Sequence, residues 1–210
     1  MKKGLFISLE GIEGTGKTTQ AKLLTEFLLQ QGYDSMITEE PGGTLIGSRI
    51  RDILLSPQHT DMDPTTELLL YFADRAQHIR ELILPALEAK RIVVTDRFTD
   101  STLAYQGYGR GIDISFILDI DRISTSCMRP DITFLLDLDV EEGLRRNKGI
   151  NKKDRLEMEN VAFHKKVRAG YHELATREPE RIKLIEATEE IGNIQRKIKN
   201  IIIDLLHTWH

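Results

Sequence analysis

The feature that most constrains the fold is a short apolar run followed by a glycine-rich loop and then a helical sequence. The apolar run spans Leu5 to Glu10, and residues 11–18 read G-I-E-G-T-G-K-T. The spacing G-x-x-x-x-G-K-T lets successive backbone N–H groups point at one centre, beside the positive N-terminal end of a helix. A strand, loop and helix in this order predict an α/β fold whose first loop binds phosphate groups.

The side chains of this loop predict a bound nucleoside triphosphate. Lys17 can reach the outer phosphates, and the hydroxyl of Thr18 can ligate Mg²⁺. A glycine-rich turn with an incidental lysine is the alternative, but it gives no reason for the strand before the loop and the helix after it. The residues expected around the phosphates are Gly11, Ile12, Glu13, Gly14, Thr15, Gly16, Lys17, Thr18 and Thr19.

Length and charge narrow the other possibilities. A chain of 210 residues suits a single domain over 1–210. The net charge of −4 argues against a general binder of nucleic acid or of anionic membranes. The single cysteine, Cys127, excludes an internal disulfide, and the first apolar run is too short to span a membrane. We expect a cytoplasmic protein with a small-molecule substrate and no nucleic-acid or membrane partner.

Strand-like runs alternate with helical segments, which is typical of a parallel sheet covered by helices on both faces. The expected strands are 5–10, 35–38, 92–95, 132–138 and 182–185. The expected helices are 17–31, 47–55, 65–89, 99–108, 115–128, 141–146, 155–177 and 191–207. We therefore predict a three-layer α/β/α fold with a five-stranded parallel sheet, and a basic lid at about 145–155.

Ligands of such sheets gather beyond the carboxyl ends of the strands, and three of these ends carry unusual residues. The segments are 39–44, 96–98 and 137–139. Asp96 and Arg97 follow a buried apolar run, where a charged pair is costly unless it faces a site. We expect Asp96 to contribute to the Mg²⁺ shell and Arg97 to bind phosphate, with a structural ion pair as the alternative.

Further candidates share faces of two helical segments. Within about one and a half turns stand four polar or aromatic residues, Ser101, Thr102, Tyr105 and Gln106. On another helix Tyr71 and Arg75 are four residues apart, so a ring that stacks on a base and a guanidinium that donates to its carbonyl could lie side by side. Spacing alone favours a partly exposed core position for Tyr71. Arg49 and Arg51 point to different sides of a short helix, and Arg51 is the one we expect in the site.

These motifs together resemble the bacterial thymidylate kinases. The resemblance rests on G-I-E-G-T-G-K-T-T, E-P-G-G-T, D-R-F-T-D-S-T-L-A-Y-Q-G, R-P-D before a strand, and D-R-L-E. It covers the chain from about residue 4 to the final helix. It implies a P-loop nucleoside monophosphate kinase fold, a homodimer with an α-helical interface, and transfer of a phosphoryl group from ATP to dTMP with Mg²⁺, as in dTTP biosynthesis.

The resemblance also implies roles for individual residues. Glu13 corresponds to a carboxylate near the sugar 3'-hydroxyl, and Arg97 and Arg51 correspond to arginines that contact the dTMP phosphate. Tyr71 stands where a phenylalanine usually stacks on thymine, and Arg75 where an arginine hydrogen-bonds the base. The thymine pocket, which also excludes a 2'-hydroxyl, is expected from Ser101, Thr102, Tyr105 and Gln106. Thr102 departs from members that have Asn there.

The family's catalytic arginine lies either in the phosphate loop or in the lid. The loop Glu13-Gly14-Thr15 has none, so the chain resembles the lid-arginine type. The basic candidates in the lid are Arg146, Lys152, Lys153 and Arg155. Arg146 and Arg155 are the strongest, because lysine cannot hold a phosphate with two parallel hydrogen bonds.

Two other functions share the phosphate loop. A P-loop kinase for another nucleotide would also use Lys17, Thr18 and Asp96, so only the base pocket distinguishes it. A nucleotide-dependent switch is the second, because Asn151 to Asp154 matches the N-K-x-D signature of GTPases. That match follows a basic loop rather than an apolar strand. The segment after Asp96 also lacks the glycine expected of a switch.

Overall fold

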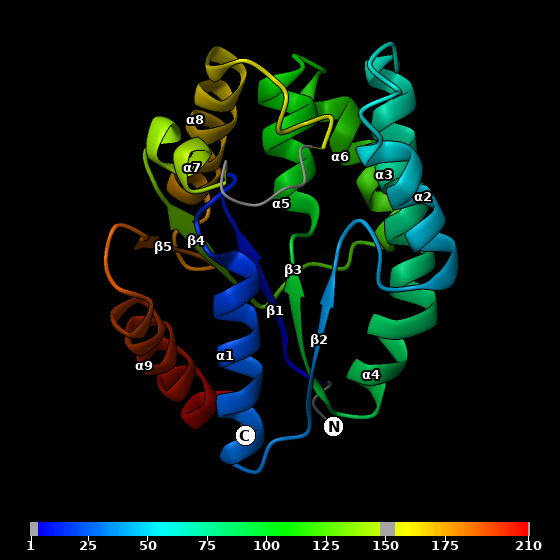
Figure 1. The fold of residues 1–210 in the computed structure, drawn as a ribbon. Coiled ribbons are helices and arrows are strands. Elements are labelled where there is room, and N and C mark those ends of the chain that lie inside the picture. The colour runs from blue at the N-terminus through cyan, green and yellow to red at the C-terminus, as the bar shows by residue number, and fades with distance from the viewer. Residues whose placement is uncertain (1–3, 148–153, 210) are drawn as a thin grey trace.

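Five parallel strands form the centre of the molecule (Figure 1). The computed structural model describes residues 4–147 and 154–209. The strands are β1 (Phe6–Glu10), β2 (Ser35–Glu39), β3 (Ile92–Asp96), β4 (Ile132–Asp137) and β5 (Ile182–Glu186), in the spatial order β2-β3-β1-β4-β5. The predicted strands are therefore confirmed, with ends displaced by one residue at most. β1 and β3 are parallel neighbours, and Leu9 near the end of β1 pairs with Asp96 at the end of β3. The phosphate loop that follows β1 and Asp96 therefore lie at the same edge of the sheet.

Helices cover both faces of the sheet (Figure 1). The elements of the described residues are α1 (Lys17–Gln30), α2 (Leu45–Leu55), α3 (Pro64–His78), the π-helical η1 (Ile79–Ile83), α4 (Leu84–Glu88), α5 (Thr99–Thr102), the π-helical η2 (Leu103–Gly109), α6 (Ile114–Thr125), α7 (Val140–Asn147), α8 (Val161–Arg177) and α9 (Ile191–Trp209). Helices α1 and α9 pack on one face, and α8, η2 and α3 lie on the other. The predicted three-layer α/β/α architecture is confirmed.

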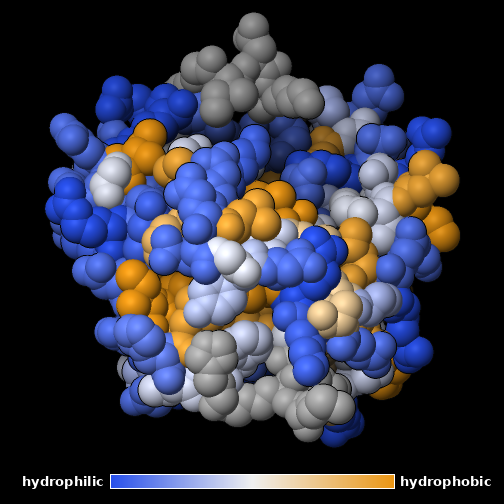
Figure 2. Space-filling model, turned by 90° about the horizontal axis from the view of Figure 1, so that it is seen from below, coloured by the Kyte–Doolittle hydropathy of each residue, from blue (hydrophilic) through white to orange (hydrophobic). Residues whose placement is uncertain are grey.

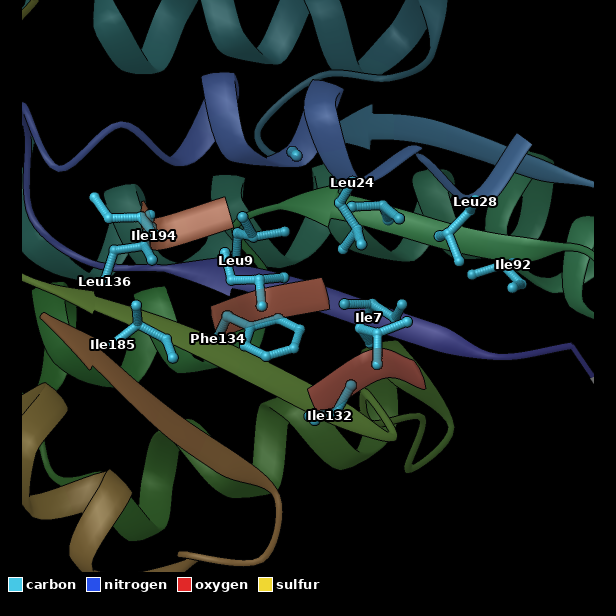
Figure 3. Close-up of a cluster of buried hydrophobic side chains, with 14 of the residues drawn as sticks. Ile7, Leu9, Leu24, Leu28, Ile92, Ile132, Phe134, Leu136, Ile185 and Ile194 are labelled. Atoms are coloured by element: carbon cyan, nitrogen blue, oxygen red, sulfur yellow. The ribbon is translucent and has the colours of Figure 1, made fainter. Parts of the chain in front are cut away.

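One large apolar cluster joins the sheet to α1 and α9 (Figure 3). Leu24 and Leu28 of α1 lie over Ile7 and Leu9 of β1, and Ile194 of α9 closes the cluster beside β5. All five side chains are buried. Burial of such side chains contributes roughly 1.5–3 kcal/mol each. This packing fixes α1 against the strand that precedes it, and so fixes the loop between them.

Several predicted helices differ in detail; for example, the helix predicted over 115–128 spans Ile114–Thr125. The segment 65–89 contains the wider π turn η1 before Pro85, which has no N–H to donate to the preceding turn. The segment 99–108 becomes α5 followed by η2. The helix predicted from 155 begins at Val161, because Asn160 accepts a hydrogen bond from the Phe163 N–H and caps it there.

The two ends of the sheet differ in chemistry. The loops after β1, β2 and β3 gather at the upper end in Figure 1. Figure 2 shows the lower end, where apolar residues near the centre are surrounded by hydrophilic ones. In the part of the chain that the structure describes, no helix combines the length and apolarity needed to cross a membrane. The candidate site residues lie at the upper end.

Candidate active site

The phosphate loop is held in a conformation that only glycine fits. Gly14 has φ +74°, and a Cβ there would stand 2.1 Å from the carbonyl oxygen of Gly143. Gly16 caps α1 with φ +87°, and no side chain among the described residues caps this helix. The N–H groups of the first turn of α1 therefore remain available to an anion.

Lys17 is folded back into the loop that precedes it. Its Nζ donates to the carbonyl oxygen of Ile12 at 2.7 Å, and the side chain is buried. Burial and the nearby charge of Arg97 lower the pKa of Lys17 to about 8, although Asp96 and Glu13 oppose the shift. The ammonium group also donates to Thr15 Oγ1 at 3.4 Å, so both of these partners are neutral oxygens that a phosphate oxygen could replace.

Thr18, in the first turn of α1, meets Asp96 at the end of β3. The Thr18 hydroxyl donates to a carboxylate oxygen of Asp96, which ends β3 beside β1. Hydroxyl and carboxylate oxygens are ligands that Mg²⁺ prefers, with water and phosphate oxygens completing the shell. No group of three or more His, Cys, Asp or Glu among the described residues is arranged to hold a metal. The pair fits a magnesium ion shared with a phosphate rather than a closed metal site.

Arg97 is placed by a backbone conformation that is rare for side chains other than glycine. Its φ of +75° aims the side chain back over the phosphate loop. The guanidinium donates to the carbonyl oxygen of Gly11 at 3.1 Å, to Ser101 Oγ at 3.0 Å and to Glu13 Oε1 at 3.3 Å. Although burial opposes the charge, nearby Tyr105, Tyr171 and Glu13 raise the pKa of Arg97, so it stays cationic. It is a fixed positive group beside the loop.

Glu13 is the acceptor at the centre of this cluster. The Tyr105 hydroxyl donates to Oε1, and Nδ1 of His164 lies 3.2 Å from Oε2. Burial alone would raise the pKa of Glu13, but His164, Arg97 and Lys17 together lower it. The carboxylate stays ionised and holds Arg97 and Tyr105 in place. His164 comes from α8, far along the chain, and no pattern in the sequence pointed to it.

A second cluster surrounds Arg75, which is 1% exposed. Its Nε donates to Glu40 Oε2 at 2.7 Å, and its Nη2 donates to Thr102 Oγ1 at 3.0 Å. His78 Nδ1 lies 2.9 Å from the other oxygen of Glu40. Among the described residues Nη1 of Arg75 has no hydrogen-bond partner. A buried guanidinium with one unused N–H group can bind the carbonyl oxygen of a ligand.

One cavity of about 400 Å³ connects the two clusters. All the residues that the sequence predicts to contact dTMP line this cavity: Glu13, Arg51, Tyr71, Arg75, Arg97, Ser101, Thr102, Tyr105 and Gln106. Arg51 enters from α2, where its Nη1 donates to the carbonyl oxygen of Pro41 at 2.5 Å, whereas Arg49 pairs with Asp52 at the surface. Phosphate-loop residues such as Lys17 and Thr18 line the same cavity. Its volume suits a small polar ligand beside a triphosphate.

Comparison with known proteins identifies the family. The family model for thymidylate kinase matches residues 9–198. Thymidylate kinase of Halothermothrix orenii is 51% identical over 199 residues, which cover 93% of this chain and 95% of that relative. The chain belongs to the thymidylate kinase family. Thymidylate kinase of Exiguobacterium sp. is 45% identical over 203 residues, covering 97% of this chain and 96% of the relative.

A solved thymidylate kinase shares the fold. The crystal structure of the enzyme from Ehrlichia chaffeensis superimposes with a TM-score of 0.79 at 35% identity, covering 95% of this chain and 98% of that one. The resemblance inferred from the sequence motifs, the P-loop kinase fold and the family are all confirmed. The cavity described above therefore lies within the part of the chain that matches the thymidylate kinase family.

The two arginines predicted for the thymidylate kinase lid lie in different surroundings. Arg146 lines the cavity, where its Nη1 donates to the carbonyl oxygen of Ala187 at 3.0 Å. Arg155 is buried outside the cavity, with Nη2 2.5 Å from a carboxylate oxygen of Glu67 and Nε donating to the carbonyl of Leu54. A buried carboxylate attracts this guanidinium away from the phosphate loop. The other lid candidates, Lys152 and Lys153, lie outside the described residues.

Sequence reasoning missed several buried polar residues that hydrogen-bond to residues of the candidate site. Glu10 accepts hydrogen bonds from Ser101 Oγ at 2.6 Å and from the Tyr171 hydroxyl at 3.0 Å. Burial and the charge of Asp100 raise the pKa of Glu10 to about 7. A glutamate that ends an apolar strand is the signal that could have indicated it. His78 and Tyr171 had no such local signal, because their partners come from distant segments.

Proposed function

We propose that this chain transfers the γ-phosphoryl group of ATP to dTMP, forming dTDP and ADP. The observation that carries the proposal is that one cavity joins the phosphate loop to the unused N–H group of buried Arg75. A triphosphate on the loop would face a nucleotide whose base reaches Arg75. We also propose that the reaction takes place in the cytoplasm, since both substrates are soluble small molecules.

The phosphates would bind between Lys17 and Arg97. The dTMP phosphate is already anionic, so it needs no general base to attack the γ-phosphorus. Lys17 would offset the charge on the transferred group, while Arg97 would hold the attacking phosphate in line. Arg51 lines the same cavity, where it donates to the carbonyl oxygen of Pro41, and would provide a second contact. Glu13 keeps Arg97 oriented in this scheme.

The base would bind between Tyr71 and Arg75. Tyr71 is buried at the cavity wall, where its ring can stack on thymine. Nη1 of Arg75 would donate to a carbonyl oxygen of the base. Tyr105, held by its hydrogen bond to Glu13, would stand beside the sugar and crowd a 2'-hydroxyl.

Mg²⁺ would be held by Thr18 and, through water, by Asp96. When bound, this ion would neutralise negative charge on the outer phosphate groups. Arg146 is the lid arginine that the described residues bring to the cavity, and we propose that it contacts the phosphates once ATP is bound. Its hydrogen bond to Glu142 is exposed and its hydrogen bond to the carbonyl of Ala187 is partly buried, so both can be exchanged at small cost.

The test is ADP release coupled to a dye reaction, with ATP, Mg²⁺ and one acceptor at a time. The acceptors are dTMP, dUMP, dCMP, dGMP, dAMP, UMP and thymidine. We expect the highest kcat/KM with dTMP. Turnover highest with another acceptor would retain a nucleotide kinase and reject the thymine pocket. ADP release that no acceptor increases would favour a nucleotide-dependent switch.

A second copy of the chain is the partner we propose. Three neighbouring helices carry large exposed apolar side chains, Ile46 and Ile53 on α2, Leu69 on α3, and Phe116 and Ile123 on α6. Ile123 is 79% exposed, and such apolar faces mark interfaces. Two copies related by a twofold axis would cover this face with itself. Light scattering after gel filtration should show a dimer that Ile123→Glu converts to a monomer, whereas Ile191→Glu on α9 should leave it dimeric. A monomeric wild type would reject the homodimer.

A further inference from the structure

At the far side of the base pocket, Gln106 is held by a buried carboxylate. Gln106 lines the cavity and is itself 1% exposed. Its Nε2 donates to Glu67 Oε1 at 2.8 Å. A glutamine amide has a donor end and an acceptor end on opposite sides. With the nitrogen committed to Glu67, the oxygen is the end that remains for the cavity.

Glu67 can only accept hydrogen bonds, because two arginines keep it ionised. The side chain is 0% exposed, and Arg110 donates to both of its oxygens at 3.2 and 3.1 Å. The guanidinium of Arg155 lies 2.5 Å from Oε2. Burial alone would raise the pKa of Glu67, but hydrogen bonds from Arg110 and Gln106 lower it. A carboxylate in this state has no proton to offer, so the Gln106 amide cannot turn over without placing oxygen against oxygen.

We propose that Glu67 is a specificity-determining positioning residue, which fixes the Gln106 amide so that its oxygen faces the base. This inference rests on the proposed function. Glu67 lies on α3 and touches no ligand in the scheme, so it acts only through Gln106. The pocket then presents one N–H donor from Arg75 and one oxygen acceptor from Gln106.

This pattern distinguishes pyrimidines by their hydrogen-bonding edge. Thymine offers a carbonyl oxygen at position 4 and an N–H at position 3. Cytosine has an amino group at position 4 and a bare nitrogen at position 3, so both contacts would be reversed. Sites whose buried polar groups are left unpaired by the wrong substrate reject it strongly. Fixing the amide therefore converts a glutamine that could serve either base into one that selects thymine.

Glu67→Gln tests the proposal through the ratio of kcat/KM for dTMP to that for dCMP. The two arginines compete for the single oxygen left at position 67, which turns its NH₂ group toward Gln106 and lets the Gln106 amide reverse. We expect the ratio to fall roughly tenfold or more. The matched control is Glu159→Gln, which removes another carboxylate paired with Arg110 at 2.5 Å but no contact to Gln106. The control should leave the ratio within about threefold of the wild type.

A ratio unchanged in Glu67→Gln, with a wild type that prefers dTMP, would overturn this inference and leave the proposed function intact. A wild type without preference for dTMP would instead reject the proposed function. Should Glu67→Gln not fold, the exchange variant Glu67→Gln with Gln106→Glu keeps one carboxylate in the cluster and an oxygen toward the base. A dTMP preference within tenfold of the wild type in the exchange variant supports the proposal, and a ratio more than tenfold below the wild type overturns it.

Discussion

Arg75→Met is the change whose consequences the structure defines most sharply. Arg75 and Glu40 are both almost fully buried and are joined at 2.7 Å. Burial alone would disfavour both charges, but the attraction between them raises the pKa of Arg75 and lowers that of Glu40. Removing the guanidinium leaves the Glu40 carboxylate buried, with His78 as its remaining side-chain partner. The loss of unfolding free energy in Arg75→Met should therefore come from the unpaired Glu40 charge rather than from lost packing.

The expected magnitudes follow from burial. Breaking a buried pair by removing one partner costs about 3–5 kcal/mol. For a chain of this length, each kcal/mol lowers the melting temperature by roughly 2–4 °C, so Arg75→Met should melt about 6–20 °C below the wild type. The double variant Arg75→Met with Glu40→Gln strands no charge and should recover most of that loss. For dTMP, losing a charged hydrogen bond of about 1.5–3 kcal/mol lowers kcat/KM roughly 10- to 150-fold in both variants.

Urea unfolding followed by circular dichroism measures the free energies, and coupled ADP release measures kcat/KM. Leu29→Ala, at an exposed position of α1, serves as a control for a change outside the pocket. Equal destabilisation of the single and double variants would refute the reasoning that charge, not packing, determines the cost. Undiminished use of dTMP by Arg75→Met would refute the assignment of Arg75 to the base.

Three further predictions concern the phosphate side of the cavity, its metal site, and the buried Asp74, which accepts a hydrogen bond from the Gly42 N–H. Lys17→Ala should reduce kcat at least 100-fold, while Arg97→Ala should mainly raise the KM for dTMP; equal loss of ATP binding in both, measured by calorimetry, would contradict this division. Chelation with EDTA should abolish turnover, and Asp96→Asn should raise the Mg²⁺ concentration for half-maximal rate; an unchanged Mg²⁺ curve would exclude Asp96 from the metal shell. Burial and the charge of Glu40 raise the pKa of Asp74 from 3.8 to about 7, so its contribution to stability is present below pH 4 and lost as the pH rises to 7. Asp74→Asn should remove a pH-dependent loss on the order of 4 kcal/mol, and parallel urea midpoints for both proteins from pH 4 to 8 would disprove it.

The sequence by itself determined the features that depend on neighbours along the chain. The spacing from Gly11 to Thr18 predicts the phosphate loop, since backbone N–H groups and a helix N-terminus need only consecutive residues. Short apolar runs predicted all five strands, and their alternation with helical segments predicted helices on both faces of the sheet. Asp96 and Arg97 were found because a charged pair directly after an apolar strand has few structural reasons to be there. Motif resemblance added the family, which comparison then confirmed.

Only the tertiary structure decided how the buried charges pair. Glu40 meets Arg75 from 35 residues away, and Glu67 meets Gln106 from 39 residues away. The sequence predicted Arg155 as a lid residue, but in the structure Arg155 pairs with Glu67. The Glu67 carboxylate is buried, and a buried carboxylate needs a nearby cation to offset its lost hydration. The pattern along the chain shows which residues are charged and which of them share one face of a helix or strand. The partner of each charge depends on which helices and strands the fold brings together.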